Sequence, residues 1–453
     1  MAKGTAAIEV ARQAVELAKR AGAEQCDAYM RMYDESEVTI RLGETEKLVE
    51  AGSRSLGLRV ITGGRTAVCS TADLSEESLE RLARETVELA RISAPDEYAG
   101  LPSPDDFARA STNGLQLYDE RLGSLTTEEK IRMAKACEAA AFAVDSRITN
   151  SEGATVTTRS GEVALANSLG FAASYPATAV ALMVEVMADD ADGKKRNDYW
   201  FSSERSLHRL LEPEEVGRIA AKRALAQLGA VKVPTKQVPV VFEPMMAVRL
   251  LGDFAACANG GALYRGATFL AGRLDTPVGS PLVTITDDPL EPGRGGSRPF
   301  DGEGVASRRT ALVEAGVFRS FLFDSYTARR AKARTTGSAA RGVESLPAPA
   351  PSNLIFQPGG TPASEVVATV EDGFFVTAVM GQGFNPSTGD FSRGAAGFWI
   401  RNGRLAHPVT EVNISGRLGE MLAAVDAVGD DLSWFGGMAA PTVRVSRMTV
   451  SGL

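Results

Sequence analysis

The chain has 453 residues, of which 44% are hydrophobic and 23% are charged, and its formal net charge is -8. This length and composition are typical of a globular protein with two or more domains. The acidic balance argues against nucleic acid as the principal ligand, because binding to phosphates requires a basic surface.

The four cysteines, Cys26, Cys69, Cys137 and Cys257, are scattered and form no CxxC pair. This spacing predicts neither a zinc knuckle nor a thioredoxin motif, and sparse thiols suit a reducing compartment. No apolar run is long enough to span a bilayer, and the N-terminal segment has the periodicity of an amphipathic helix rather than of a signal peptide. We therefore expect a cytoplasmic protein that does not enter a membrane.

Residues 1–100 are predicted to form a first α+β unit. A helix ends near Gly22, strand-like runs follow, and a second helix begins after the capping residue Ser75. The dipeptide Gly63-Gly64 is a hairpin signal between the last two runs. The expected strands are 26–32, 37–42, 56–61 and 66–70.

Residues 115–230 repeat this order after a proline-rich linker at 94–114. The capping-box pattern Thr126-x-x-Glu129 opens a helix, and a closing helix is expected to end at Gly229. The strands expected between them are 154–158, 163–166 and 179–187. The repeated order indicates two units of helix, antiparallel meander and helix, and it suggests an internal duplication.

The C-terminal region, 233–453, follows a second linker at 231–238 and is dominated by strand and turn signals. One helix is expected at 245–260, with an apolar stripe that should be buried: Leu251, Phe254, Ala255 and Ala258. The strongest hairpin signal of the chain is Asn402-Gly403. The expected strands are 282–286, 316–323, 353–356, 374–380, 397–400, 405–409 and 442–450. We predict an α+β fold whose C-terminal domain is β-rich and barrel-like or sandwich-like.

Two segments, 287–304 and 329–352, are too long to be simple turns, and such segments are usually functional or disordered. The first carries the acidic residues Asp287, Asp288, Glu291, Asp301 and Glu303. They lack EF-hand spacing, so we interpret them as a solvated loop. The basic residues Arg329, Arg330, Lys332, Arg334 and Arg341 are interpreted in the same way. The glycine-rich segment 381–397 lacks a P-loop pattern and predicts a tight loop near an interface or a peptide groove.

Seven stretches of the C-terminal half carry a family resemblance when they are taken together and in order. They are VVFEPMMAVRLLGDFAACANGGALYRGATFL at 240–270, SPLVTITDD at 280–288, FDGEG at 300–304, GDFSRG at 389–394, GFWIRNG at 397–403, HPV at 407–409 and GDD at 429–431. They resemble the TldD/PmbA family, also called TldD/TldE. The N-terminal order of elements is consistent with this resemblance.

The resemblance implies one of two kinds of subunit. The TldD kind carries His-Glu-x-x-x-His on the helix that begins the C-terminal domain, where the histidines bind zinc and the glutamate is the general base. The matching positions here are Gly252, Asp253 and Cys257. Where a C-terminal cysteine ligand is expected, the chain reads Trp434-Phe435-Gly436-Gly437. The joint loss of these ligand types resembles the TldE/PmbA kind of subunit, which pairs with TldD.

The chain has two histidines, His208 and His407, and neither lies in a metal-ligand pattern. We interpret His208 as a surface residue and His407 as a structural residue beside the Asn402-Gly403 turn. Asp253 and Cys257 are too few donors for a zinc site, so we interpret them as a helix carboxylate and a buried thiol. We therefore predict no catalytic, metal or cofactor-binding residue in this chain and expect zinc in a TldD-type partner.

Three functions of different classes follow. The first is a non-catalytic subunit of a heterodimeric metallopeptidase that degrades unfolded or modified peptides and removes leader peptides, with peptide held by strand addition. The second is a self-sufficient metallopeptidase with an unrecognised site, which would contain stoichiometric zinc. The third is a homodimeric peptide-binding scaffold. The family's link to DNA gyrase offers a fourth function, which the acidic charge disfavours.

Overall fold

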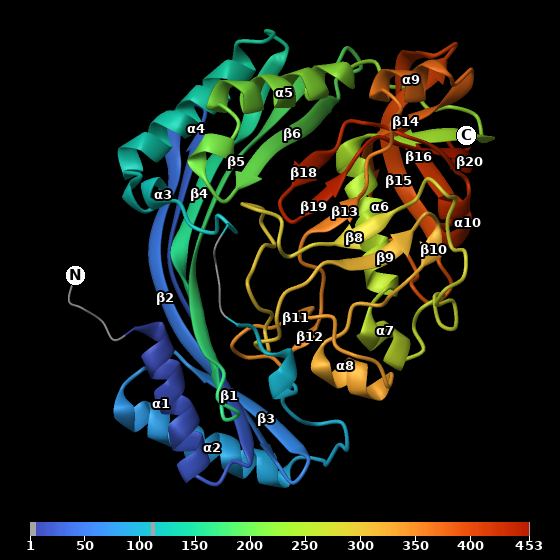
Figure 1. Cartoon of the computed structure of the whole chain (residues 1–453). Helices are drawn as coiled ribbons and strands as arrows, with labels where there is room; N and C mark the ends of the chain where they lie inside the picture. Colours follow the sequence, from blue (N-terminus) through green and yellow to red (C-terminus); the bar gives the residue numbers. More distant parts are fainter. Residues whose placement is uncertain (1–5, 110–113, 453) are drawn as a thin grey trace.

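The N-terminal half of the chain forms one curved antiparallel sheet (Figure 1). The computed structural model describes residues 6–109 and 114–452, so residues 1–5 of the predicted first helix and 110–113 of the predicted linker lie outside the described residues. The sheet order is β3-β2-β1-β4-β5-β6, and its centre is the antiparallel pair β1–β4. The two predicted meanders therefore join edge to edge through their first strands.

The elements of the two units follow the predicted order. The first unit contains α1 (Ala7–Arg20), β1 (Gln25–Arg41), β2 (Glu44–Thr62), β3 (Arg65–Thr71) and α2 (Glu76–Ile92). The second contains α3 (Glu120–Ser124), α4 (Thr127–Phe142), β4 (Ile148–Asn167), β5 (Ala172–Asp189), β6 (Lys195–Glu204) and α5 (Pro213–Ala226). Short 3-10 turns lie at Pro104–Asp106 and Leu207–Arg209.

The local signals at the ends of these elements are confirmed. Ser75 accepts a hydrogen bond from the backbone N–H of Ser78, and Thr126 and Glu129 form a reciprocal capping box. Gly63 and Gly64 both have positive φ and connect Thr62 to Arg65 in a hairpin. Turn and cap chemistry therefore sets where these elements begin and end.

The strands are longer than predicted, and the predicted pairs of short strands are wrong. Residues 26–32 and 37–42 belong to the single strand β1, and 154–158 and 163–166 belong to β4. Polar residues such as Asp34 and Arg159 resemble strand breaks, but they lie where one face of the sheet is accessible, so they interrupt nothing. The strand β6 was not expected at all.

Alternation along β1 separates the two faces of the sheet. Cys26, Ala28 and Met30 pack in the apolar cluster beneath α1 and α2, while Val38 and Ile40 pack beneath α4 and α5. The intervening residues face the concave side, toward the C-terminal domain, and the helices lie on the convex side (Figure 1). Gly217 lets α5 approach α4, because a Cβ there would lie 2.1 Å from the carbonyl oxygen of Cys137.

The C-terminal domain contains a closed five-stranded barrel, which confirms the barrel-like alternative. The sheet order is β16-β15-β14-β7-β20-β17, and the pairing of β16 with β20 closes it. The five barrel strands are β7 (Lys236–Phe242), β14 (Asp372–Met380), β15 (Asp390–Arg401), β16 (Arg404–Arg417) and β20 (Val443–Ser451), and β17 (Val425–Val428) pairs with β20 beside them. Asn402 and Gly403 have positive φ and form the predicted hairpin between β15 and β16. The predicted linker 231–238 ends inside β7.

A second sheet, with the order β10-β9-β8-β13-β19-β18, completes this domain. Its strands are β8 (Ile285–Asp287), β9 (Thr310–Glu314), β10 (Val317–Phe318), β13 (Leu354–Phe356), β18 (Ser433–Phe435) and β19 (Met438–Ala440). The remaining elements are α6 (Pro244–Cys257), α7 (Gly260–Tyr264), α8 (Ser325–Arg330), α9 (Ala363–Ala368), α10 (Leu418–Ala423) and the pair β11 (Ala339–Ala340) and β12 (Ala348–Pro349). Among the described helices, none is long and apolar enough to cross a membrane.

A buried ionic cluster joins the sheet to the C-terminal domain. Arg59 on β2 donates to Asp27 on β1 and, over 3.1 Å, to Glu303. Arg341 donates to the other oxygen of Asp27 over 2.6 Å. Although burial alone would raise it, Arg341 and Arg59 hold the pKa of Asp27 below its ordinary value.

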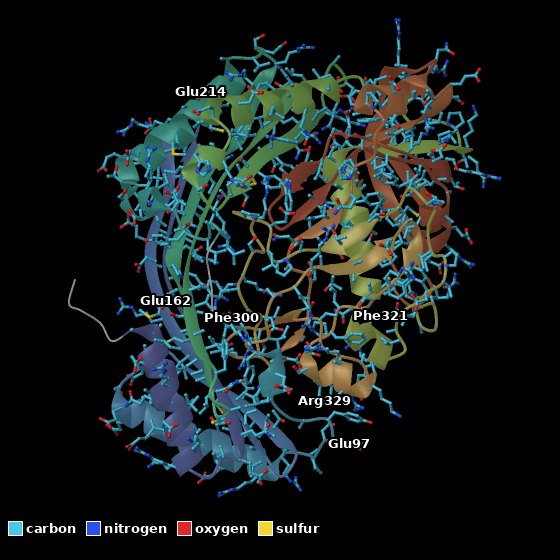
Figure 2. The ribbon with its side chains drawn as sticks, viewed as in Figure 1. Glu97, Glu162, Glu214, Phe300, Phe321 and Arg329 are labelled. Atoms are coloured by element: carbon cyan, nitrogen blue, oxygen red, sulfur yellow. The ribbon has the colours of Figure 1, made fainter. Side chains whose placement is uncertain are left out.

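These contacts correct two predictions about the long segments. Asp287, Asp301 and Glu303 are almost fully buried rather than solvated, as is Arg341. Arg329 donates to the backbone carbonyls of Tyr98, Leu101 and Gly100. Local sequence cannot reveal such residues, because their partners come from the other half of the chain. Figure 2 shows Phe300 between the sheet and the C-terminal domain, where its ring contacts Phe171 and Tyr175.

Candidate functional site

The helix α6 runs through the core of the C-terminal domain. Pro244 occupies its first turn, where a missing N–H costs no helical hydrogen bond. The predicted stripe of Leu251, Phe254, Ala255 and Ala258 is buried, which confirms the expectation for this helix. The helix ends at Cys257, three residues before the predicted end.

One stripe of α6 remains accessible. Arg249 and Ala256 are exposed, and Gly252 and Asp253 between them are half-buried. The spacing of three, four and seven residues places these four positions on one helical face. Two of the three positions that correspond to the zinc motif therefore lie on the accessible side of the helix.

Asp253 forms an ion pair with Arg393 on β15. The guanidinium Nη2 lies 2.8 Å from Asp253 Oδ1, and both side chains are nearly buried. Burial raises the pKa of Asp253 above its ordinary value, against the opposing effect of Arg393. Asp253 Oδ2 has no hydrogen-bond partner among the described residues. This carboxylate is therefore committed to an internal cation.

Cys257 points away from the accessible stripe, toward the glycine-rich segment. Its sulfur lies 3.8 Å from the carbonyl oxygen of Pro386, and burial raises the pKa of the thiol to about 12. A neutral thiol is a poor metal ligand, because zinc binds the thiolate. Gly252 has open space beyond it, since a Cβ there would meet no heavy atom within 4 Å, but it offers no donor.

The segment Trp434–Gly437 lies beside α6, because β18 and β19 both contact this helix. Gly436 has positive φ at the turn between the two strands. The fold thus brings together the two regions that would supply zinc ligands in the TldD kind of subunit. Here they contribute an ion-paired carboxylate, a neutral thiol and aromatic rings, which do not fit a zinc ion.

Residues 6–109 and 114–452 contain no group of three or more His, Cys, Asp or Glu side chains placed to hold a metal ion. His208 is exposed on the turn Leu207–Arg209, as predicted, and His407 on β16 lies opposite Trp399 on β15.

Three family models match the chain, all of the PmbA/TldA metallopeptidase: domain 1 at 26–90, the central domain at 110–228 and the C-terminal domain at 235–452. The chain belongs to the PmbA/TldD metallopeptidase family. The match at 235–452 covers the seven stretches of the C-terminal half that carried the resemblance.

Relatives in the PmbA/TldD family differ in how similar they are to this chain. It is 34% identical to the metalloprotease PmbA homolog of Haemophilus influenzae, over 97% of this chain and 94% of that protein. It is 25% identical to the metalloprotease TldD homolog of the same organism, over 88% of this chain and 87% of that protein.

Solved structures share the fold over the full length. A Bacteroides thetaiotaomicron protein, crystallised as a candidate modulator of DNA gyrase, is 28% identical with a TM-score of 0.91 and 98% coverage of both chains. TldE from Thermococcus kodakarensis is 19% identical with a TM-score of 0.87, over 99% of this chain and all of that chain. At that identity the second likeness concerns the fold alone.

A cleft of about 390 Å³ lies beside the first half of α6, and Arg249 is the one residue of the accessible stripe that lines it. Arg249, Met245 and Met246 come from the helix, Met380 from β14 and Tyr199 from β6. The wall that β6 supplies was missed in the sequence, because the strand itself was not expected. Its run of three aromatic residues, Tyr199 to Phe201, was the available signal, because aromatic residues are enriched in strands.

Asp198 and Glu243 are further site residues that the sequence did not reveal. Both flank Arg223 on α5, which donates to both oxygens of Glu243 over 2.9 and 3.0 Å and lies 3.3 Å from Asp198. Burial raises the pKa of each of these carboxyl groups, while Arg223 opposes the shift. This triad fixes the start of α6 against the N-terminal sheet.

Proposed function

We propose that this chain is a PmbA/TldE-type, non-catalytic subunit of a heterodimeric TldD–TldE metallopeptidase. The observation that carries the proposal is the state of α6, where Asp253 is paired with Arg393, Cys257 is a neutral thiol and Gly252 has no donor. The higher identity to a PmbA homolog than to a TldD homolog supports the same assignment. Zinc would reside in the TldD-type partner.

The role of this subunit is to hold peptide and to complete the partner. Unpaired strand edges accept the backbone of an extended peptide with little regard to its sequence. The substrates are unfolded or modified peptides, including leader segments that the complex removes. A cytoplasmic location agrees with this role.

The test is reconstitution with a TldD-type chain from the same organism. Each chain alone and the two together are assayed for cleavage of an unstructured peptide, and zinc is measured in each preparation. We expect activity from the pair, and neither zinc nor cleavage from this chain alone. Stoichiometric zinc and cleavage by this chain alone would instead support a self-sufficient metallopeptidase. Peptide binding by a homodimer that ignores the TldD-type chain would support a scaffold.

A double variant tests the chemistry of α6 directly. Asp253→Asn with Cys257→Ala should leave the activity of the reconstituted complex nearly intact, because neither side chain is free to act on substrate. The matched control is the TldD-type partner with its motif glutamate changed to glutamine, which should be inactive. A loss of about a hundredfold in kcat/KM, with fold and complex preserved, would place α6 of this chain in the chemistry.

A further inference from the structure

Two strand edges without a strand partner meet at one place on this molecule. β6 is the last strand of the N-terminal sheet, and β18 is the last strand of the second C-terminal sheet. In the described part of the chain, each pairs on one side only. Figure 1 shows the two strands beside each other, and the rings of Trp200 and Phe201 on β6 contact the ring of Phe435 on β18.

The space between these edges is a pocket of about 340 Å³. This volume lies at the lower end of the range of about 300–1,000 Å³ that is usual for ligand sites. Four aromatic residues line it: Trp200, Phe201, Trp434 and Phe435. All four are only half-buried, so part of each residue remains accessible.

The four charged residues of the pocket lining, Glu204, Arg209, Glu243 and Arg294, carry no net charge. Arg294 stacks over the ring of Trp434 at 4.3 Å and lies 3.6 Å from Glu204. Glu243 is bound by Arg223. Arg209 donates to the side-chain oxygen of Gln116 over 3.1 Å. Because its lining carries no net charge, the pocket favours a neutral ligand over a strongly charged one such as a phosphate. The indole nitrogen of Trp200 is buried and has no acceptor among the described residues.

We propose that the groove between β6 and β18 binds an extended peptide segment and holds one large apolar side chain of it. The peptide backbone pairs with one of the two free strand edges. An aromatic or long aliphatic side chain of the peptide enters among Trp200, Trp434 and Phe435. Edges that natural proteins usually cover are here left open on both sides of an aromatic pocket. This inference rests on the proposed peptide-holding role and adds the place and the preferred side chain.

The test uses the isolated full-length chain and two dye-labelled, unstructured peptides of Gly, Ser and Thr that differ at one central residue, Phe or Ser. Fluorescence anisotropy should show that the Phe peptide binds at least roughly tenfold more tightly than the Ser peptide. Trp434→Ala should abolish this preference, and Trp434→Phe should restore most of it. Tyr264→Ala, an aromatic truncation on α7 at a residue that is 50% exposed, serves as the control and should bind like wild type.

A second measurement does not depend on how the variants fold. Adding the Phe peptide to the wild-type chain should slow amide hydrogen exchange in β6 and β18, with little change in β2. Equal binding of the two peptides, unchanged exchange in β6 and β18, or no binding at millimolar peptide would each overturn the inference. If groove variants lose nothing while the chain still supports its partner's activity, this inference alone fails. If the groove binds peptide but the chain supports no partner, the proposed function alone fails.

Discussion

At the scale of single residues, the site is defined by what each side chain is already bound to. Asp253 has the chemistry of a general base, but its Oδ1 lies 2.8 Å from the guanidinium of Arg393, so this oxygen is already bound to an internal cation. Cys257 has the chemistry of a ligand, but its thiol stays protonated in an apolar setting. The residue type therefore determines which role a side chain could take, and its immediate partner determines whether it is free to take that role.

Phe254 offers a direct measure of how well the core around α6 is packed. Its ring is fully buried and lies edge-on to Phe318 at a centroid distance of 6.3 Å. Phe254→Ala should reduce the free energy of unfolding by about 3–5 kcal/mol, because the ring is lost and a cavity remains. Urea denaturation measures the change. Leu405→Ala, at a residue that is 46% exposed on β16, should change stability by less than about 0.5 kcal/mol.

Asp301 should make the stability of the chain depend on pH. It is buried, and burial together with the neighbouring Glu303 raises its pKa to about 7, although Arg298 and backbone N–H groups oppose the shift. A carboxyl whose pKa is higher in the folded state binds its proton more strongly there. Its contribution is therefore greatest in acid and is lost as pH rises from about 4 to 7.

The variant Asp301→Asn removes this titration. It should be less stable than wild type in acid, because the carboxyl oxygen that accepts from the N–H of Ala339 can become an amide donor. From pH 5 to 8, the stability of wild type relative to the variant should fall by roughly 2–3 kcal/mol. Thermal or urea unfolding across this range measures the difference. A difference that stays constant with pH would show that Asp301 is ionised throughout.

At the scale of helices and strands, the ends of elements were predictable and their lengths were not. The signals Gly63-Gly64, Asn402-Gly403 and the Thr126 capping box act within four residues, so the sequence displays them fully. The continuity of β1 depends instead on pairing with β2 on one side and β4 on the other. Those partners supply backbone hydrogen bonds even where Asp34 and Glu35 weaken the strand pattern.

At the scale of the whole molecule, the two halves are joined by buried charges as well as by apolar contacts such as those of Phe300 with Phe171 and Tyr175. The position of α6 within the family pattern could be read from the sequence, as could the absence of ligand types around it. The buried ionic cluster could not be predicted from the sequence. Asp27 and Arg341 are more than 300 positions apart, and each resembles an ordinary polar residue of its own segment. Charge pairs across such distances leave no local pattern.

Arg59 is the residue of the buried ionic cluster whose substitution should reduce the free energy of unfolding most. It binds Asp27 and Glu303 together, so Arg59→Met would leave two buried carboxylates without this partner. We expect a loss of about 3–5 kcal/mol in unfolding free energy, as for other broken buried ion pairs. Arg12→Met, which removes an exposed pair with Glu9 on α1, should change stability by less than about 1 kcal/mol. Similar effects of the two variants would show that the buried cluster does not hold the halves together.

The central pairing of β1 with β4 also sets an order in which the protein can form during its synthesis. β1 is complete at residue 41, but β4 does not begin until residue 148. At about 5–20 residues per second, the ribosome needs on the order of 5–20 s to bring out the missing strand. During that interval the nascent chain carries an open strand edge that can pair with a neighbouring nascent chain on the same message. The edge of β1 that pairs with β4 in the finished sheet is thus the part of the nascent chain most open to pairing with another chain.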